Sequence, residues 1–194
     1  MRDGVLVHWS DLLAVRAEAQ GRRLGEALKR YQRDRCRAIG VERMYWTYDP
    51  FVARNAHINL NVLGARIDEF VADMYGTATN SPVHGSLGTD RFVAVWPVRD
   101  EPTPMPSDRF LLTDVPLAAG PDGAAHVLPD APTVAVTIPA DYADLLAGDM
   151  TAARTWRLGA RHAFVHYFER GYNVSAFIRS AGSASYLLSS AESR

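Results

Sequence analysis

A short turn carries the residue pattern with the clearest chemical meaning in this chain. It lies between a stretch rich in strand-forming residues, 4–15, and a helical pattern that begins at Leu24, and it reads Gln20-Gly21-Arg22-Arg23-Leu24-Gly25. The first N–H groups of a helix have no intrahelical partners and lie at the positive end of the helix dipole. A strand, a glycine-containing turn and a helix N-terminus together predict an anion site suited to a diphosphate.

The charge around this turn agrees with an anionic ligand. The 194-residue chain has a net charge of -1, which gives no general attraction to nucleic acid or acidic membranes, yet residues 16–37 contain eight basic and three acidic side chains. A basic segment in a nearly neutral protein favours a phosphorylated ligand. A solvated helix face rich in arginine explains the composition equally well, so both interpretations stay open here.

Other reactive residue types are sparse. Cys36 is the only cysteine, so no internal disulfide is expected, and its place in a helical pattern favours packing over reactivity. His162 and His166 are one helical turn apart, a spacing that can hold zinc. The glutamate of the metalloprotease motif is missing between them. A structural role is therefore favoured, and no metal site is expected.

Hydrophobic periodicity predicts the elements that would position the turn. Strands are predicted at 4–15, 41–48, 65–74, 90–98, 109–113 and 133–138, and a hairpin is predicted around Gly182. Helices are predicted at 24–39, 51–62 and 140–169, the last with a break near Gly148. Asp49 and Pro50 are typical of a helix start. This alternation of strands and helices predicts an α/β fold with helices packed on a sheet.

The turn and the hundred residues after it resemble the GNAT acetyltransferase superfamily. Gln20 and Gly25 match the first and last positions of its acetyl-CoA motif, Arg/Gln-x-x-Gly-x-Gly/Ala, and Arg23 replaces the middle glycine. A bacterial branch of predicted GNAT proteins is similar to this chain in the runs WTYDPFVARNAHINLNVLGA (46–65), MYG (74–76) and TDRFVAVW (89–96). The resemblance covers roughly residues 5–98.

The resemblance implies an acyl-CoA-dependent N-acyltransferase that acts by direct attack in a ternary complex and needs no metal. The pantetheine arm would lie between splayed parallel strands, here 5–15 and 41–48. An acetyl or succinyl group would pass to a small-molecule amine, an amino acid being the favoured acceptor. The residues implied in coenzyme binding are Leu13, Ala14, Val15, Gln20, Gly21, Arg22, Arg23, Leu24, Gly25, Asn55 and Asn59.

The acid–base group is left open by the resemblance. Many GNAT proteins use a tyrosine on the second helix, and the matching position here is Leu60, which cannot transfer a proton. Tyr48 and His57 are nearby and are the catalytic candidates, because both side chains can exchange protons.

The residue pattern, together with the resemblance over the first part, predicts an organisation in three parts. Residues 1–98 form an acyl-CoA-binding core, 99–132 a proline-rich linker with one strand, and 133–194 a strand–long helix–hairpin unit. A complete GNAT domain has about three strands and two helices before its diphosphate strand, so the implied fold is a mixed sheet, with helices on both faces, that lacks its N-terminal part. The C-terminal unit could supply part of a second GNAT-like half, and an open sheet edge favours a homodimer.

Two other functions remain as alternatives. The first is a non-catalytic CoA-binding or interaction module, which Leu60 and the short N-terminal part favour. The second is a nucleotide-binding α/β protein, which would share the phosphate turn but would need Walker or three-glycine motifs that the sequence lacks. No run of about 18 apolar residues indicates a membrane span, and no signal peptide is evident, so a cytoplasmic protein without membrane contact is expected.

Overall fold

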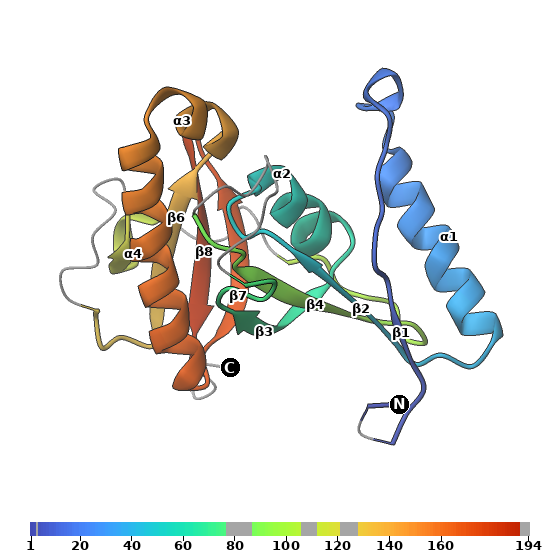
Figure 1. Cartoon of the computed structure of the whole chain (residues 1–194). Helices are drawn as coiled ribbons and strands as arrows, with labels where there is room; N and C mark the ends of the chain where they lie inside the picture. The colour runs from blue at the N-terminus through green and yellow to red at the C-terminus, as the bar shows by residue number, and fades with distance from the viewer. Residues whose placement is uncertain (3, 77–86, 106–111, 121–127, 191–194) are drawn as a thin grey trace.

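Two four-stranded mixed sheets form the framework of the protein (Figure 1). The computed structural model describes residues 1–2, 4–76, 87–105, 112–120 and 128–190. The first sheet has the order β1-β2-β4-β3 and consists of β1 (Val7–Trp9), β2 (Arg43–Tyr48), β3 (Arg66–Val71) and β4 (Arg91–Pro97). The second has the order β5-β6-β8-β7 and consists of β5 (Leu117–Ala119), β6 (Thr133–Pro139), β7 (Asn173–Arg179) and β8 (Ser183–Ser189).

Helices connect the strands of each sheet. In the first half, α1 (Leu24–Ala38) joins β1 to β2, while α2 (Ala53–Ala56) and the π-helical η2 (His57–Val62) join β2 to β3. In the second half, α3 (Tyr142–Gly148) and α4 (Met150–Glu169) join β6 to β7. The short 3-10 helices are η1 (Ala17–Ala19) and η3 (Leu112–Asp114). Figure 1 shows α1 and α4 on opposite sides of the molecule, with both sheets between them.

The two sheets share one strand order and one set of directions. In each, the first two strands along the chain are parallel, β1 with β2 and β5 with β6. The other two strands then form an antiparallel pair whose later member lies beside the second strand. The halves differ in the segment that connects their two parallel strands. In the first half this segment contains α1, whereas the residues described between β5 and β6 contain no helix.

A single hydrophobic core joins the halves. Aromatic rings from both halves meet in it, with Phe92 of β4 contacting Phe164 of α4 at a centroid distance of 4.8 Å and Tyr186 of β8 at 5.2 Å. Phe70 of β3 also contacts Phe164, at 5.2 Å. Burial of each such ring contributes roughly 1.5–3 kcal/mol. The first sheet, which carries the turn, is therefore held firmly by the second half.

Most predicted elements are confirmed. Helix α1 ends just before Gly40, which adopts a left-handed φ of +79°, and the long helix divides into α3 and α4 at residue 149. The mixed α/β class, the parallel pairing of the first two strands and the C-terminal hairpin are also as expected. Within the described residues, none of the helices has the length and apolarity to cross a bilayer.

The predicted strand at 4–15 is wrong in length, because only Val7–Trp9 pair with β2. A bond from the Ser10 N–H to the Tyr45 carbonyl, 2.7 Å long, lies at the point where the chain then leaves β2. Beyond it Leu12 is 85% exposed. The β-forming residues of this stretch have no strand to pair with, so their propensity is not realised.

Two other predicted elements are displaced. Asp49 does not cap a helix, because its Oδ1 accepts from the Phe51 N–H in a turn, and α2 begins later, at Ala53. The strand expected at 109–113 lies partly outside the described residues, and Leu112 and Thr113 belong to η3. The strand of this region is β5, four residues further on, where Pro116 accepts from the Ala135 N–H and leads into the pairing with β6.

Candidate functional site

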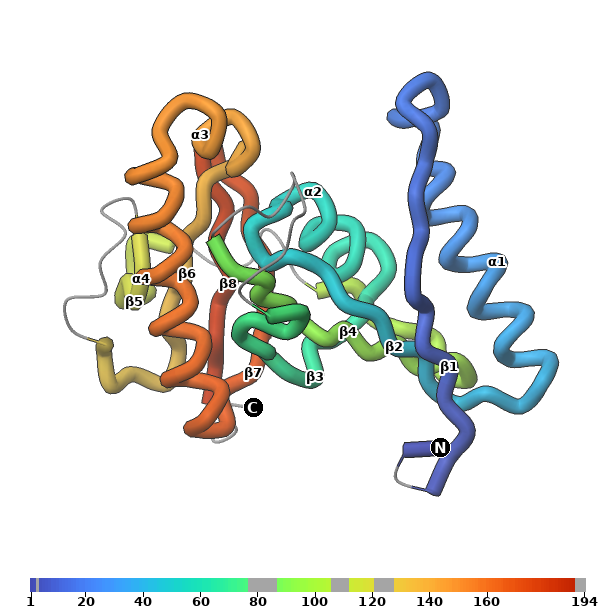
Figure 2. Tube along the Cα trace, viewed as in Figure 1, coloured from blue at the N-terminus to red at the C-terminus, as the bar shows by residue number. Residues whose placement is uncertain are grey.

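The turn before α1 has an unusual backbone conformation. Gly21 and Arg23 adopt left-handed φ values of +78° and +56°. Glycine adopts this region freely, whereas another residue there costs about 1–2 kcal/mol. Arg23 thus keeps a glycine-like conformation at the position where the GNAT motif has its middle glycine. The turn lies at one extremity of the molecule, where Figure 2 follows the chain from β1 into α1.

The N-terminus of α1 presents free hydrogen-bond donors. Arg23 is the N-cap residue and makes no side-chain capping bond, and the first helical bond runs from the Ala27 N–H to the Arg23 carbonyl, at 3.1 Å. The amides of Leu24, Gly25 and Glu26 consequently have no partner within the described protein. Three such amides and the helix dipole favour an anion at this point.

Two adjoining cavities surround this terminus. The helix groove, about 520 Å³, is lined by the turn, the start of α1 and residues 54–62. The strand cleft, about 150 Å³, is lined by residues 10–13, residues 46–48, Lys29 and the α2–η2 segment. Both cavities share the same four lining residues, Leu13, Gly25, Asn55 and Ile58. They therefore adjoin each other, and together we call them the recess, which extends from the helix terminus to the gap between β1 and β2.

The strand cleft exists because the two parallel strands separate. After Ser10 bonds to Tyr45, the backbone amides of 11–15 make no hydrogen bond within the described protein. Backbone donors that are free and accessible beside a cavity can bind an extended ligand in the manner of an added strand.

The basic cluster of 16–37 serves two different purposes. Toward the end of α1, Arg33 and Arg37 donate to main-chain carbonyls at the end of β4 and just after it, those of Pro97, Val98, Arg99 and Asp100. Near the helix start, Arg23 and Arg30 pair with Glu26, and although burial opposes the shift, their hydrogen bonds hold the pKa of Glu26 below its usual value. Of the basic residues in this cluster, Arg23 and Lys29 line the recess.

Most of the residues implied in coenzyme binding line this recess. The helix groove contains Leu13, Val15, Gln20, Gly21, Arg23, Leu24, Gly25 and Asn55, and the strand cleft contains Asn59 as well. Ala14 and Arg22 are exposed and line neither cavity. Gln20 joins two sides of the groove, since its amide donates to the Val15 carbonyl and accepts from Arg54.

The two catalytic candidates differ in their surroundings. His57 lines the helix groove, with its Nδ1 3.2 Å from the Asn61 Oδ1. Tyr48 lines the strand cleft, but its hydroxyl is enclosed, lacks a hydrogen-bond partner of good geometry, and has a pKa raised far above the ordinary value by burial. That hydroxyl keeps its proton. Leu60, at the usual tyrosine position, is fully buried in the core.

Sequence reasoning missed Lys29, which lines the strand cleft beside Ser10. Lys29 Nζ donates to Ser10 Oγ at 2.9 Å, and Ser10 Oγ donates to Gln32 Oε1 at 3.1 Å. A signal was present, because Lys29 lies four residues after Gly25 and therefore on the same face of the helix. Cys36, on the buried side of α1, packs in the core, and burial raises the pKa of its thiol.

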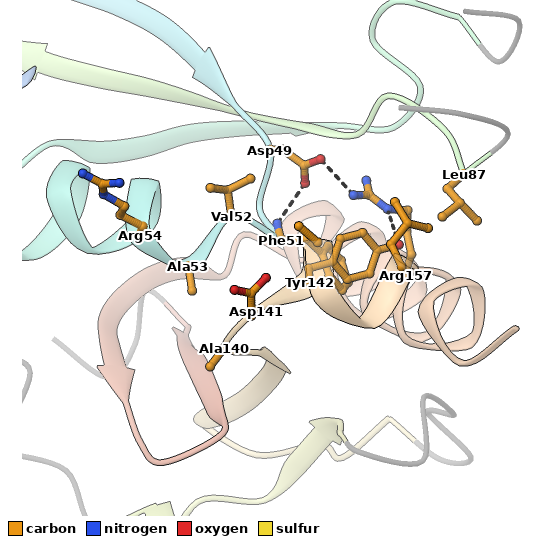
Figure 3. Close-up of a pocket in the computed structure, with 12 residues that line it drawn as sticks. Asp49, Phe51, Val52, Ala53, Arg54, Leu87, Ala140, Asp141, Tyr142 and Arg157 are labelled. Atoms are coloured by element: carbon orange, nitrogen blue, oxygen red, sulfur yellow. Dashed lines mark hydrogen bonds and ion pairs between the residues drawn. The ribbon is translucent and has the colours of Figure 1, made fainter. Parts of the chain in front are cut away.

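A third cavity, about 270 Å³, lies where the two halves meet (Figure 3). We call it the junction cavity; its walls are mainly apolar and include Phe51, Val52, Leu87 and Leu146. Arg157 of α4 lies at its side, with its guanidinium 4.7 Å from the Phe51 ring centre and 5.0 Å from that of Tyr142. Arg54 lines both this cavity and the helix groove.

An ionic network surrounds Arg157. Its Nη2 donates to Asp49 Oδ2 at 2.8 Å, and its Nε donates to the Tyr142 hydroxyl at 3.2 Å. Arg161, one turn later, pairs with Asp73 at 2.8 Å and with Asp90 at 2.7 Å. Although burial opposes the shift, the charge of Asp49 holds the pKa of Arg157 above its usual value. This network links α4 to the end of β2 and the start of β4.

Within the residues that the structure describes, no three His, Cys, Asp or Glu side chains are gathered as metal ligands would be. The hydrogen-bond donors along the recess include backbone amides and the side chains of Arg23, Arg54 and the buried Lys29. Comparison of the chain with protein-family models, with curated proteins and with solved structures gives no match.

Proposed function

We propose that this protein is an acyl-CoA-dependent N-acyltransferase. The coenzyme diphosphate binds the free amides at the start of α1, and the pantetheine arm lies in the strand cleft. The observation that supports this best is that the two cavities of the recess adjoin and share Leu13, Gly25, Asn55 and Ile58 in their walls. One end offers helix donors for a diphosphate, and the other offers unpaired strand amides for an extended amide-containing arm.

Direct transfer suits such a recess. The acceptor amine attacks the thioester carbonyl, and a backbone amide near Leu13 stabilises the oxyanion that forms. Holding both reactants in line can contribute roughly 7–11 kcal/mol to the barrier reduction. The proposed acyl group is acetyl or succinyl, and the use of such coenzymes is consistent with a cytoplasmic protein.

An amino acid is the proposed acceptor. Arg54 is exposed where the helix groove and the junction cavity meet, so a carboxylate could bind its guanidinium while the side chain enters the apolar cavity. Charge-assisted bonds from arginine to carboxylate are among the stronger hydrogen bonds in proteins.

A second candidate function is a CoA-binding module without catalysis. The enclosed Tyr48 hydroxyl and the buried Leu60 favour it, because neither supplies the proton that the leaving thiolate needs.

Ligand-induced stabilisation tests the proposal. Acetyl-CoA, succinyl-CoA and CoA are expected to raise the Tm, and ATP is not. A ligand that binds only the folded state stabilises it by about 2.7 kcal/mol at 100 times its Kd. Free-thiol release with a panel of amino acids then separates an enzyme from a binding module. Stabilisation by ATP without stabilisation by CoA would overturn the proposal in favour of a nucleotide-binding protein.

A further inference from the structure

Lys29 is a buried cation without a counter-charge. Its residue is 7% exposed, and its Nζ contacts Ser10 Oγ at 2.9 Å, Gln32 Oε1 at 3.5 Å and the Trp46 ring, whose centre is 4.1 Å away. All these partners are neutral, and no ion pair joins Lys29 to a carboxylate of the described residues. Lysine is rarely buried unless it is paired.

Burial without a partner changes the acid–base behaviour of this amine. Desolvation lowers the pKa of Lys29 from 10.5 to about 8. About a quarter of the side chain is then neutral at pH 7.5, against about 0.1% for an ordinary lysine. A group with a pKa near the working pH can both accept and return a proton efficiently.

The position of Lys29 gives this behaviour a use. Its side chain lines the strand cleft together with Ser10, Trp46 and Asn59. This is the part of the recess where the proposed thioester would lie. Ser10 and the Trp46 ring, which Asn59 holds through a 3.3 Å bond to the indole N–H, fix the direction of the lysine chain.

We propose, on the basis of the function above, that Lys29 is the acid–base residue of the acyl transfer. The acceptor nitrogen forms a bond to the acyl carbon, the C–S bond breaks, and its electron pair goes to sulfur. Neutral Lys29 takes the proton that the attacking nitrogen loses and gives it to the departing thiolate. The lysine ends neutral, as it began, and no other reactant is needed.

The groups around Lys29 are compatible with this role. The titratable and charged groups around it are His8, Asp11 and Tyr48 from the neighbouring segments, and Arg33 and Cys36 from α1 itself. Tyr48 is enclosed and stays protonated. Cys36, about two turns after Lys29 on α1, is buried outside the cleft lining, and burial raises the pKa of its thiol. Asp11 is exposed at the edge of the cleft. Lys29 is thus the buried proton carrier of the cleft.

The sequence makes a direct test practical, because Lys29 is the only lysine in the chain. Protein labelled with ¹³C at lysine Cε gives a single lysine signal in NMR spectra. The expected signal titrates near pH 8 and moves when acetyl-CoA is added. A signal that titrates near pH 10, or one that acetyl-CoA leaves unchanged, overturns the inference without any variant.

Kinetics supply the second readout. Thiol release from acetyl-CoA by the wild type should rise with pH through about 8, while Lys29→Met and Lys29→Arg should lower kcat about 100-fold and lose that rise. Arg35→Met is the control, since Arg35 is exposed on the same helix away from the recess, and it should keep the wild-type profile. Circular dichroism checks that each variant is folded.

The outcomes separate this inference from the function on which it rests. A wild type that releases thiol, with Lys29 variants that keep both kcat and the pH profile, overturns the role of Lys29 alone. A wild type that binds acetyl-CoA but acylates no acceptor is a binding module, and the inference fails with the enzyme. A wild type that acetyl-CoA does not stabilise overturns the proposed function itself.

Discussion

Two buried cations in this protein have opposite surroundings. Lys29, beside the strand cleft, is 7% exposed, and Arg157, beside the junction cavity, is 4% exposed. Arg157 is paired with Asp49 at 2.8 Å and lies 3.9 Å from Asp90, whereas the partners of Lys29 are a hydroxyl, an amide and an indole ring. Although burial opposes the shift, the charge of Asp49 raises the pKa of Arg157, whereas desolvation lowers the pKa of Lys29.

The comparison shows that equal burial has opposite consequences for a paired and an unpaired charge. A paired buried cation is fixed in one charge state, so its contribution is structural, and loss of either partner is costly. An unpaired one is held between charge states, which is useful for proton transfer and unfavourable for stability. The ion pairs of Arg157 at the junction cavity therefore hold the two halves together. Lys29 in the recess is instead a buried charge without a counter-charge.

Removal of Arg157 should have the largest effect on stability. Arg157→Met removes the cation that lies 2.8 Å from the partly buried Asp49, while Asp90 keeps its pair with Arg161. Breaking a buried pair typically costs about 3–5 kcal/mol, which is the upper bound here. The measurement is urea unfolding followed by circular dichroism.

Arg154→Met is the matched control, because Arg154 is exposed on the same helix one turn earlier. A surface change of this kind should alter the unfolding free energy by no more than about 0.5 kcal/mol. If both variants unfold at the same urea concentration, the ionic network of Arg157 does not stabilise the contact between the two halves.

The unpaired lysine should appear in the pH dependence of stability. Its folded pKa of about 8 lies below the ordinary 10.5. Between these values the unfolded chain binds more protons, so stability should rise with pH through this window by at most about 3 kcal/mol. Below pH 8 both states are protonated and the burial penalty is constant.

Lys29→Met isolates this effect. Burial also raises the pKa of tyrosines such as Tyr48 and Tyr186, which destabilises the fold above about pH 10 in both proteins. From pH 7.5 to 9.5 the unfolding free energy of the wild type should therefore increase relative to that of the variant. A difference that is constant with pH would mean that Lys29 is not held near neutrality.

Local patterns predicted the elements of the recess well. The helical periodicity from Leu24 and the left-handed glycine after the helix, Gly40, fixed α1 almost to the residue. Five of the six residues from Gln20 to Gly25 line the helix groove. These features depend on neighbours within a few positions along the chain, which is the range that periodicity and turn residues can report.

Long-range partners could not be predicted in the same way. Asp49 looked like a helix cap, but Arg157, 108 positions later, binds its carboxylate. The stretch after Trp9 has strand-forming residues but diverges from β2 after Ser10. The environment of Lys29 depends on Ser10, just after β1, and on Trp46 of β2, so its burial could not be predicted from the helix pattern alone.

A substitution at Gly25 tests the recess and is expected to have the smallest effect of the three changes. A Cβ added there would meet only Leu13 Cδ2, at 3.8 Å, and Gly25 does not need a left-handed φ. A larger side chain should therefore fit the fold but narrow the recess at a residue that lines both cavities.

Gly25→Val should lower acetyl-CoA affinity at least tenfold, about 1.4 kcal/mol, as measured by calorimetry. Its unfolding free energy should stay within about 1 kcal/mol of the wild type, because valine replaces the poorest helix former except proline. Gly40→Ala is the opposite control: Gly40 has a φ of +79° and lies away from the recess. It should cost about 1 kcal/mol in stability and leave affinity unchanged. Equal affinity of Gly25→Val and wild type would place the coenzyme elsewhere, because a diphosphate on the α1 amides cannot share that space with a branched side chain.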